Sequence, residues 1–148
     1  MKVEIKEMRR ADYEAALALW QRCEGIGLSD ADEEPALTRF LNANQGLCLA
    51  GWDEEALVAT CLCGSDGRRG YLYHLAVDPQ YRRMGIGMSM VNQVFERLAK
   101  LEIHKCHIMV YADNESGLAF WKQCGWATRP EIVLMSKSVC GGNHDVPC

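Results

Sequence analysis

Apolar and polar residues follow patterns that divide the first half of the chain into a strand, two helices and three further strands. Strict alternation predicts the first strand, and apolar residues at helical spacing predict the two helices, the second with Pro35 in its first turn. Three apolar runs separated by short polar turns then predict a meander of strands. In chain order these elements are a strand at 3–8, helices at 13–23 and 33–43, and strands at 47–52, 56–64 and 71–77.

The second half of the chain alternates helices with strands. Residues 88–101 carry an apolar stripe at helical spacing, which is typical of a helix packed on a core. A strand at 107–111, a helix at 114–124 capped by Gly125, and a closing strand at 132–136 follow. The chain is therefore predicted to be α/β, with a mixed sheet of six to seven strands and helices on both faces, in the order β-α-α-β-β-β-α-β-α-β.

A short segment with the sequence RRMGIG, residues 82–87, joins the strand at 71–77 to the helix at 88–101. Glycine lets the backbone approach a ligand closely, and the unpaired N–H groups at a helix N-terminus attract phosphate. No lysine follows the glycines as a P-loop requires, and Met90 stands where a dinucleotide-binding motif needs its third glycine. The segment predicts a phosphate or pyrophosphate site, the alternative being a glycine pair that serves turn geometry alone.

Two ordered motifs resemble those of the GNAT superfamily of N-acetyltransferases. In residues 75–87, LAVDPQYRRMGIG matches the family pattern Arg/Gln-x-x-Gly-x-Gly/Ala after a strand that ends in Val-x-Pro. The second motif is Asn114, then a helix through Leu118, Phe120 and Trp121, closed by Gly125 and Trp126. The resemblance extends over residues 49–137, and in the second half the chain looks most like the small bacterial YpeA- and RimI-like proteins.

The GNAT resemblance implies acetyl-CoA as the donor and direct attack of an amine on its thioester. The backbone of 83–88 would bind the pyrophosphate, and the pantetheine arm would pair with the strand before the turn, where the Leu75 N–H would serve as an oxyanion donor. Asn114 would contact the same arm, although asparagine is also a preferred N-cap and both roles can hold together. The expected acetyl-CoA site comprises Leu75, Ala76, Val77, Arg82, Arg83, Met84, Gly85, Ile86, Gly87, Met88, Asn114 and Trp121.

Two positions depart from the family pattern. Trp121 stands where many members have a tyrosine that protonates the leaving thiolate, and Met109 stands where some have a glutamate base. Because residues 107, 109 and 111 share one strand face, we expect Tyr111 to be catalytic alongside Leu75, the alternative being departure of the thiolate unassisted or through water. The same alternation places residues 71, 73 and 75 on one face of the preceding strand and predicts a structural hydrogen-bonding role for His74 on the other.

Charge gathers in two places along the chain. Residues 24–34 contain five acidic residues and no basic one, whereas four arginines, at 68, 69, 82 and 83, surround the glycine turn. We interpret the acidic cluster as a surface that attracts an amine and the basic cluster as one that attracts phosphates. The alternative is that both are solvent-exposed loops without a binding role. The expected substrate-binding residues are Glu24, Asp32, Glu33 and Tyr73.

Length and composition fit one globular domain. The 148 residues are 49% hydrophobic and 24% charged, and we expect a single domain at 1–139 with a flexible tail at 140–148. The start of the chain has no signal-like apolar region and no apolar run approaches the ~20 residues of a membrane span, so a soluble cytoplasmic protein without a membrane partner is expected. The net charge of -4 gives no support to nucleic-acid binding.

The eight cysteines lie mostly within apolar patterns, which predicts small buried side chains in a reducing compartment. Cys140, His144 and Cys148 repeat every four residues in the tail, but three ligands without a fourth partner do not make a site, and no metal is expected.

The sequence as a whole favours an acetyl-CoA-dependent N-acetyltransferase that acts on a primary amine, either a small molecule or a peptide or protein N-terminus. A noncatalytic acetyl-CoA-binding module is the alternative, because the usual acid and base are both missing. A third hypothesis is a homodimeric interaction protein in which the glycines only allow the backbone to turn and bind no ligand. An N-acetyltransferase could also be a homodimer.

Overall fold

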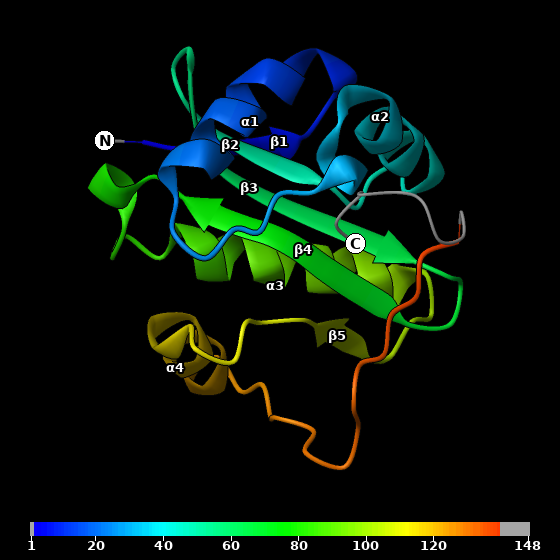
Figure 1. Cartoon of the computed structure of the whole chain (residues 1–148). Helices are drawn as coiled ribbons and strands as arrows, with labels where there is room; N and C mark the ends of the chain where they lie inside the picture. The colour runs from blue at the N-terminus through cyan, green and yellow to red at the C-terminus, as the bar shows by residue number, and fades with distance from the viewer. Residues whose placement is uncertain (1, 140–148) are drawn as a thin grey trace.

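The centre of the molecule is one mixed five-stranded sheet (Figure 1), seen in a computed structural model that describes residues 2–139. The strands lie side by side in chain order; the first four are antiparallel to one another, while the fourth and fifth run parallel. Their bounds are β1 (Glu4–Glu7), β2 (Leu49–Asp53), β3 (Ala56–Ser65), β4 (Gly70–Val77) and β5 (Cys106–Ile108).

Four α-helices and three short 3-10 helices complete the described part of the chain. Each α-helix lies within one or two residues of its predicted position, because its apolar stripe and its end signals are local features of the sequence. The α-helices are α1 (Tyr13–Arg22), α2 (Glu34–Ala43), α3 (Ile86–Lys100) and α4 (Glu115–Gln123), and the 3-10 helices are η1 (Arg10–Asp12), η2 (Asp30–Asp32) and η3 (Pro79–Tyr81).

Helices cover both faces of the sheet, as predicted (Figure 1). On the face of α1 and α2, Trp20 and Leu37 pack with Leu62 from β3 in one core cluster. On the opposite face, α3 contributes the apolar stripe that packs with Leu72 from β4, and α4 adds Trp121. These two clusters remove the large apolar side chains of the helices from water, which is the main favourable contribution to folding.

The predicted sheet of six to seven strands is wrong by at least one strand, because the described chain has five. The expected closing strand at 132–136 has no hydrogen-bonded partner strand within residues 2–139 and forms no regular structure. The strand expected at 107–111 is also shorter, ending at Ile108. Strand propensity alone does not make a strand, since its backbone N–H and C=O groups need a neighbour to pair with.

A β-bulge in β4 breaks the predicted alternation of its side chains. Thr60 pairs with Ala76 and Leu62 with Tyr73, so β4 carries one extra residue between these pairs, and His74 has a left-handed φ of 45°. As a result Tyr73 packs on the face of α1 and α2, whereas Leu75 packs on the face of α3. The prediction that residues 71, 73 and 75 share one face is therefore wrong.

The described cysteines are free thiols, and most are buried. Cys23, Cys48, Cys61 and Cys63 are buried within the two core clusters, which confirms the prediction for these four, while Cys106 and Cys124 are partly exposed. Burial raises the pKa of Cys48 to about 12, and it also raises that of Cys61. Such thiols stay protonated near neutral pH and serve as small apolar side chains.

Candidate functional site

Strand β5 ends partway along β4. They pair at only three positions, from Gly70 opposite Cys106 to Leu72 opposite Ile108. From Tyr73 to Val77, β4 continues with no strand partner on this side within the described residues. This open edge offers backbone N–H and C=O groups to an extended ligand, in the manner of β-strand addition.

The glycine turn begins immediately beyond the open edge. Arg83 and Gly85 both have left-handed backbones, with φ of 64° and 77°, and α3 starts at Ile86. The first hydrogen bond of the helix runs from Ser89 N to Gly85 O, so the preceding N–H groups at 86–88 lack partners within the helix. An anion placed here would meet these N–H groups and the positive end of the helix dipole.

Gly87 brings the start of α3 close to the open edge. A Cβ built on Gly87 would lie 3.5 Å from the ring of Phe120 and 3.7 Å from the side chains of Leu75 and Val77. The glycine therefore lets α3, α4 and β4 converge at one place. The phosphate-attracting turn and the open strand edge form one continuous surface.

Arginine side chains fix the turn to the end of β4. The Arg82 guanidinium donates from Nε to the Val77 carbonyl over 3.1 Å, and Arg22 of α1 donates to the Asp78 carboxylate over 2.9 Å. The Asp78 pKa is lowered, first by the backbone N–H of Gln80 and further by Arg22. Arg82 thus contacts the end of β4 just before the turn, and Arg83 is exposed at its surface.

The loop between α1 and α2 crosses the sheet near the open edge (Figure 1). A Cβ built on Gly27 would lie 2.1 Å from the Tyr111 hydroxyl, and one built on Gly25 would lie 2.7 Å from Asn114 Nδ2. Because Gly25 and Gly27 have no side chains, this loop can lie against Asn114 and Tyr111, which follow β5. The contact encloses the space between β4 and β5 from the side of α1.

The Asn114 side chain is fixed by a hydrogen bond, whereas Tyr111 is largely exposed to solvent. The Asn114 side chain accepts a hydrogen bond from Gly117 N over 3.0 Å and caps α4, so its structural role is real. Tyr111 is 59% exposed, and Met109 on the same segment is 57% exposed. Tyr111 is therefore not a buried core tyrosine.

Trp121 lies in the core. It is 8% exposed, and its ring lies 5.1 Å from that of Phe120 and 5.0 Å from that of Trp126, between ring centroids. The three aromatic rings support the α4 side of the open edge.

Asp32 and His74 form a hydrogen-bonded pair that the sequence patterns did not reveal. Asp32 Oδ1 lies 2.6 Å from His74 Nε2, and Asp32 Oδ2 accepts from Ser29 N over 3.0 Å. The Trp20 ring packs edge-on against the imidazole, with 4.7 Å between the ring centroids. Burial raises the pKa of Asp32, but its contacts with His74 and its hydrogen bond from Ser29 N together lower that pKa by more, so the net shift is downward. His74 lies at the β-bulge, on the face opposite Leu75 as predicted, but no local sequence signal predicts the bulge or the pairing with Asp32.

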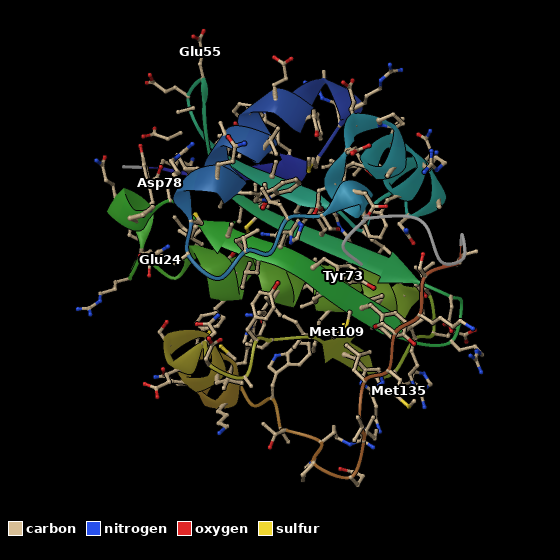
Figure 2. All side chains as sticks on the ribbon, viewed as in Figure 1. Glu24, Glu55, Tyr73, Asp78, Met109 and Met135 are labelled. Carbon is tan, nitrogen blue, oxygen red and sulfur yellow. The ribbon has the colours of Figure 1, made fainter. Side chains whose placement is uncertain are left out.

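Of the remaining predicted substrate residues, Figure 2 labels Glu24, which follows α1, and Tyr73 on β4. Glu24 and Glu33 are exposed, whereas Tyr73 is half-buried with its ring 5.8 Å from that of Phe40. Burial raises the Tyr73 pKa. Asp32 is engaged by His74, so Glu24 and Glu33 are the exposed carboxylates among the residues expected to recruit an amine.

A surface hollow lies elsewhere on the described residues. It has a volume of about 470 Å³, is lined by residues of η1 and α1 together with Glu34, and contains none of the expected site residues. A strand edge that binds an extended chain is a shallow feature, and we therefore assign the site from backbone geometry.

Known proteins resemble this chain in sequence and in fold. The model of the acetyltransferase (GNAT) family matches residues 6–126. The chain belongs to the GNAT acetyltransferase family. An acetyltransferase of Pectobacterium atrosepticum is 30% identical over 132 residues, covering 89% of this chain and 93% of the relative. Membership of this family makes the protein an acyltransferase, and specifically an N-acetyltransferase.

Solved GNAT-like structures share the fold at lower identity. The PaiA N-acetyltransferase of Thermoplasma acidophilum, solved in complex with coenzyme A, superposes with a TM-score of 0.75 at 18% identity, covering 84% of this chain and 89% of the other. An Arabidopsis thaliana protein in complex with the bisubstrate analogue CoA-Ac-MVNAL gives a TM-score of 0.65 at 19% identity, covering 84% and 83%.

Two further observations concern the described residues alone. Between residues 2 and 139, no helix is long and apolar enough to cross a membrane. The same residues hold no group of three or more His, Cys, Asp or Glu side chains placed to bind a metal ion. Cys140, His144 and Cys148 lie outside the described residues, as does the expected tail at 140–148.

Proposed function

We propose that this GNAT protein transfers the acetyl group of acetyl-CoA to a primary amine, by direct attack of the amine on the thioester. The observation that carries the proposal is the open edge of β4 from Tyr73 to Val77, which leads directly into the glycine turn at the start of α3. An extended pantetheine arm and a pyrophosphate are joined in acetyl-CoA in the same order.

The described residues fit the donor molecule. The N–H groups at 86–88 and the left-handed turn at Arg83 and Gly85 suit a pyrophosphate, and Arg83 adds an exposed positive charge. The backbone from Leu75 to Val77 suits the amide groups of the pantetheine arm. The thioester would then lie near the β-bulge, with Leu75 beside it.

The chemistry follows from this placement. The neutral amine nitrogen forms a bond to the thioester carbon, and the carbonyl oxygen becomes an oxyanion. The nitrogen then loses a proton to solvent, the C=O bond re-forms, and the C–S bond breaks as the thiolate leaves. The Leu75 N–H is our candidate donor to the oxyanion, a role whose loss costs ~3 kcal/mol in other enzymes. The Tyr111 hydroxyl, at the exposed side of the open edge, is our candidate for returning a proton to the thiolate.

The acceptor is expected on the side of the α1–α2 loop. Glu24 and Glu33 are exposed there, and their charges would attract a cationic amine. The Arabidopsis thaliana neighbour binds an analogue that joins CoA to the sequence MVNAL, which makes a peptide N-terminus one acceptor class to test beside small amines. A cytoplasmic location is part of this proposal, because the described cysteines are free thiols.

A noncatalytic acetyl-CoA-binding module remains the second candidate. One observation favours it: the side chains at the two positions where family members place an acid and a base are the buried Trp121 and the exposed Met109, and neither transfers protons.

One experiment separates these functions. The protein is incubated with acetyl-CoA and a panel containing a polyamine, an aminoglycoside, a peptide with a free N-terminus and the same peptide already N-acetylated. Mass spectrometry detects the products, because thiol reagents would also react with the protein's cysteines. Acetylation of any free amine supports the enzyme, whereas thermal stabilisation by acetyl-CoA without any product selects the binding module. Absence of both would overturn the assigned site.

A further inference from the structure

Two consecutive buried hydrogen bonds lead from α1 to the β-bulge of β4. Trp20 Nε1 donates to Thr60 Oγ1 over 2.8 Å, and Thr60 Oγ1 donates to the His74 carbonyl over 2.9 Å. The Trp20 and Thr60 side chains are buried, at 1% and 0% exposure. Thr60 carries the only hydroxyl on β3 between Ala56 and Gly64. A buried hydroxyl costs free energy unless it is hydrogen-bonded, and here both partners are supplied.

The direction of both hydrogen bonds follows from the chemistry of the groups. An indole N–H is only a donor and a carbonyl oxygen is only an acceptor, so the hydroxyl accepts from Trp20 and gives its one proton to His74. Each donor therefore points the same way, from α1 toward β4. Hydrogen bonds in such a series polarise one another, which strengthens the last of them.

The last acceptor belongs to the peptide group that carries the Leu75 N–H. The His74 carbonyl and the Leu75 N–H are the two ends of one planar trans peptide, and they point in opposite directions. Because the carbonyl end faces Thr60 on β3, the N–H end faces away from β3. On that side, β4 has no strand partner beyond Leu72 within the described residues. The hydrogen bond from Thr60 therefore sets the direction in which the Leu75 N–H points.

The backbone of the bulge needs this support. His74 has a left-handed φ of 45°, which is strained for a residue with a side chain and persists only where surrounding contacts hold it. A bulge also interrupts the regular ladder, so the backbone groups beside it depend on other partners. Asp32 and Trp20 contact the imidazole of His74, whereas Thr60 holds its backbone.

We propose that Thr60 is a positioning residue for acetyl transfer, whose hydroxyl, held by Trp20, aims the Leu75 N–H at the thioester carbonyl and strengthens it as a donor. The inference rests on the proposed function, in which this N–H stabilises the oxyanion. Donors that are already aimed where charge develops usually make the largest single contribution to such catalysis. Thr60 is fully buried and acts on the reaction through the His74 peptide.

Thr60→Val removes the hydroxyl and keeps the shape of the side chain. The Leu75 N–H then loses its fixed direction, so kcat should fall about tenfold, less than the roughly 10²–10³-fold cost of losing a whole oxyanion donor. The affinity for acetyl-CoA, measured by calorimetry, should change little because the contact matters most in the transition state. Leu98→Ala, in the core on the face of α3, controls for destabilisation and should leave kcat unchanged where the variant is folded.

Thr60→Ser and Thr60→Cys separate the hydrogen bond from the packing. Both remove the same methyl group, and they differ only in carrying a hydroxyl or a thiol, which is a weak donor. Thr60→Ser should keep most of the kcat of the unmodified protein, whereas Thr60→Cys should lose it. This pair decides the question even if Thr60→Val does not fold. A kcat that follows the melting temperature across the variants, rather than the presence of the hydroxyl, would show that Thr60 serves the fold alone.

The carbonyl stretch of bound acetyl-CoA tests the same contact without an acceptor amine. With ¹³C at the thioester carbonyl, isotope-edited infrared spectroscopy measures the frequency of that bond, which a hydrogen bond from the Leu75 N–H lowers. The frequency should rise in Thr60→Val and return in Thr60→Ser.

The infrared and kinetic results together distinguish the two proposals. A protein that binds acetyl-CoA and acetylates no amine would overturn the proposed function, and the carbonyl frequency would still decide whether Thr60 aims the N–H. An active protein whose Thr60→Val variant keeps both its kcat and this frequency would overturn the role of Thr60 alone. Failure to bind acetyl-CoA would overturn both.

Discussion

The Asp32 carboxylate and the His74 imidazole lie 2.6 Å apart and join the loop before α2 to the β-bulge of β4. The side chains of both are largely shielded from water, at 12% and 15% exposure. Because His74 directly precedes Leu75, this contact ties the acceptor side of the site to the proposed oxyanion donor. We therefore propose that Asp32 acts on the site through His74, in place of the direct substrate contact that the acidic sequence cluster suggested.

Asp32→Asn should destabilise the protein in a pH-dependent way. The carboxylate pKa is below its ordinary 3.8 in the folded state, so its contribution is fully present above that pH and is lost as the pH falls through the folded-state pKa. We expect a loss of about 1.5–3 kcal/mol in the free energy of unfolding at pH 7, as for hydrogen bonds to charged groups. Urea unfolding at pH 7 and near pH 3 checks this, since the difference between the two proteins should shrink at the lower pH.

A double-mutant cycle isolates the pair itself. His74→Phe keeps a ring against Trp20 but removes the hydrogen bond, so the effects of His74→Phe and Asp32→Asn should fall well short of additive when combined. Additive effects would mean that the two residues stabilise the fold separately.

Tyr111→Phe should lower kcat by about 10²-fold if the hydroxyl transfers a proton, and should leave the affinity for acetyl-CoA nearly unchanged. Stability should change by less than about 0.5 kcal/mol, because the side chain is more than half exposed. Steady-state kinetics across a pH series is the measurement. An unchanged kcat throughout would show that the thiolate leaves unassisted or through water.

Gly27→Ala provides a second approach to the same hydroxyl. The new Cβ would lie 2.1 Å from the Tyr111 hydroxyl, so either the loop or the ring must move, and kcat should fall. In the background of Tyr111→Ala, which removes the clash, Gly27→Ala should have no further effect. If it lowers kcat equally in both backgrounds, the loop matters for a reason unrelated to Tyr111.

Gly85→Asp should abolish the thermal stabilisation by acetyl-CoA, which is about 2.7 kcal/mol at a hundredfold excess over Kd. The position is open but left-handed, with φ of 77°, and a carboxylate there would repel the pyrophosphate. Gly85→Asn is the matched control, because asparagine has the same shape, tolerates this backbone and carries no charge. Differential scanning fluorimetry should show that acetyl-CoA still raises the melting temperature of Gly85→Asn but not that of Gly85→Asp. An undiminished rise in Gly85→Asp would show that the phosphates bind elsewhere.

Glu24→Gln combined with Glu33→Gln should raise KM for a cationic amine and weaken its dependence on salt, because both carboxylates are exposed near the acceptor side. The KM for acetyl-CoA should stay nearly constant. Kinetics at low and moderate ionic strength checks this, and parallel changes in both KM values would indicate a folding effect of the loop.

The helices and the glycine turn could be predicted from the sequence because their signals are local. Apolar spacing places α3 within two residues of its observed bounds, and the turn depends on Gly85, whose left-handed backbone is accessible to glycine without strain. Asn114 likewise caps α4 through its own side chain. Each of these features is determined by a few consecutive residues.

Only the tertiary structure decided the features that need a distant partner. The bulge at His74 arises from the pairing of β4 with β3, and the contact of His74 with Asp32 joins residues 42 positions apart. The segment 132–136 has a strand's composition but no partner strand in the described chain, so its composition predicted a strand that is absent. Local patterns specify what a segment is able to form, whereas its hydrogen-bonding and packing partners, which are remote in sequence, decide what it does form.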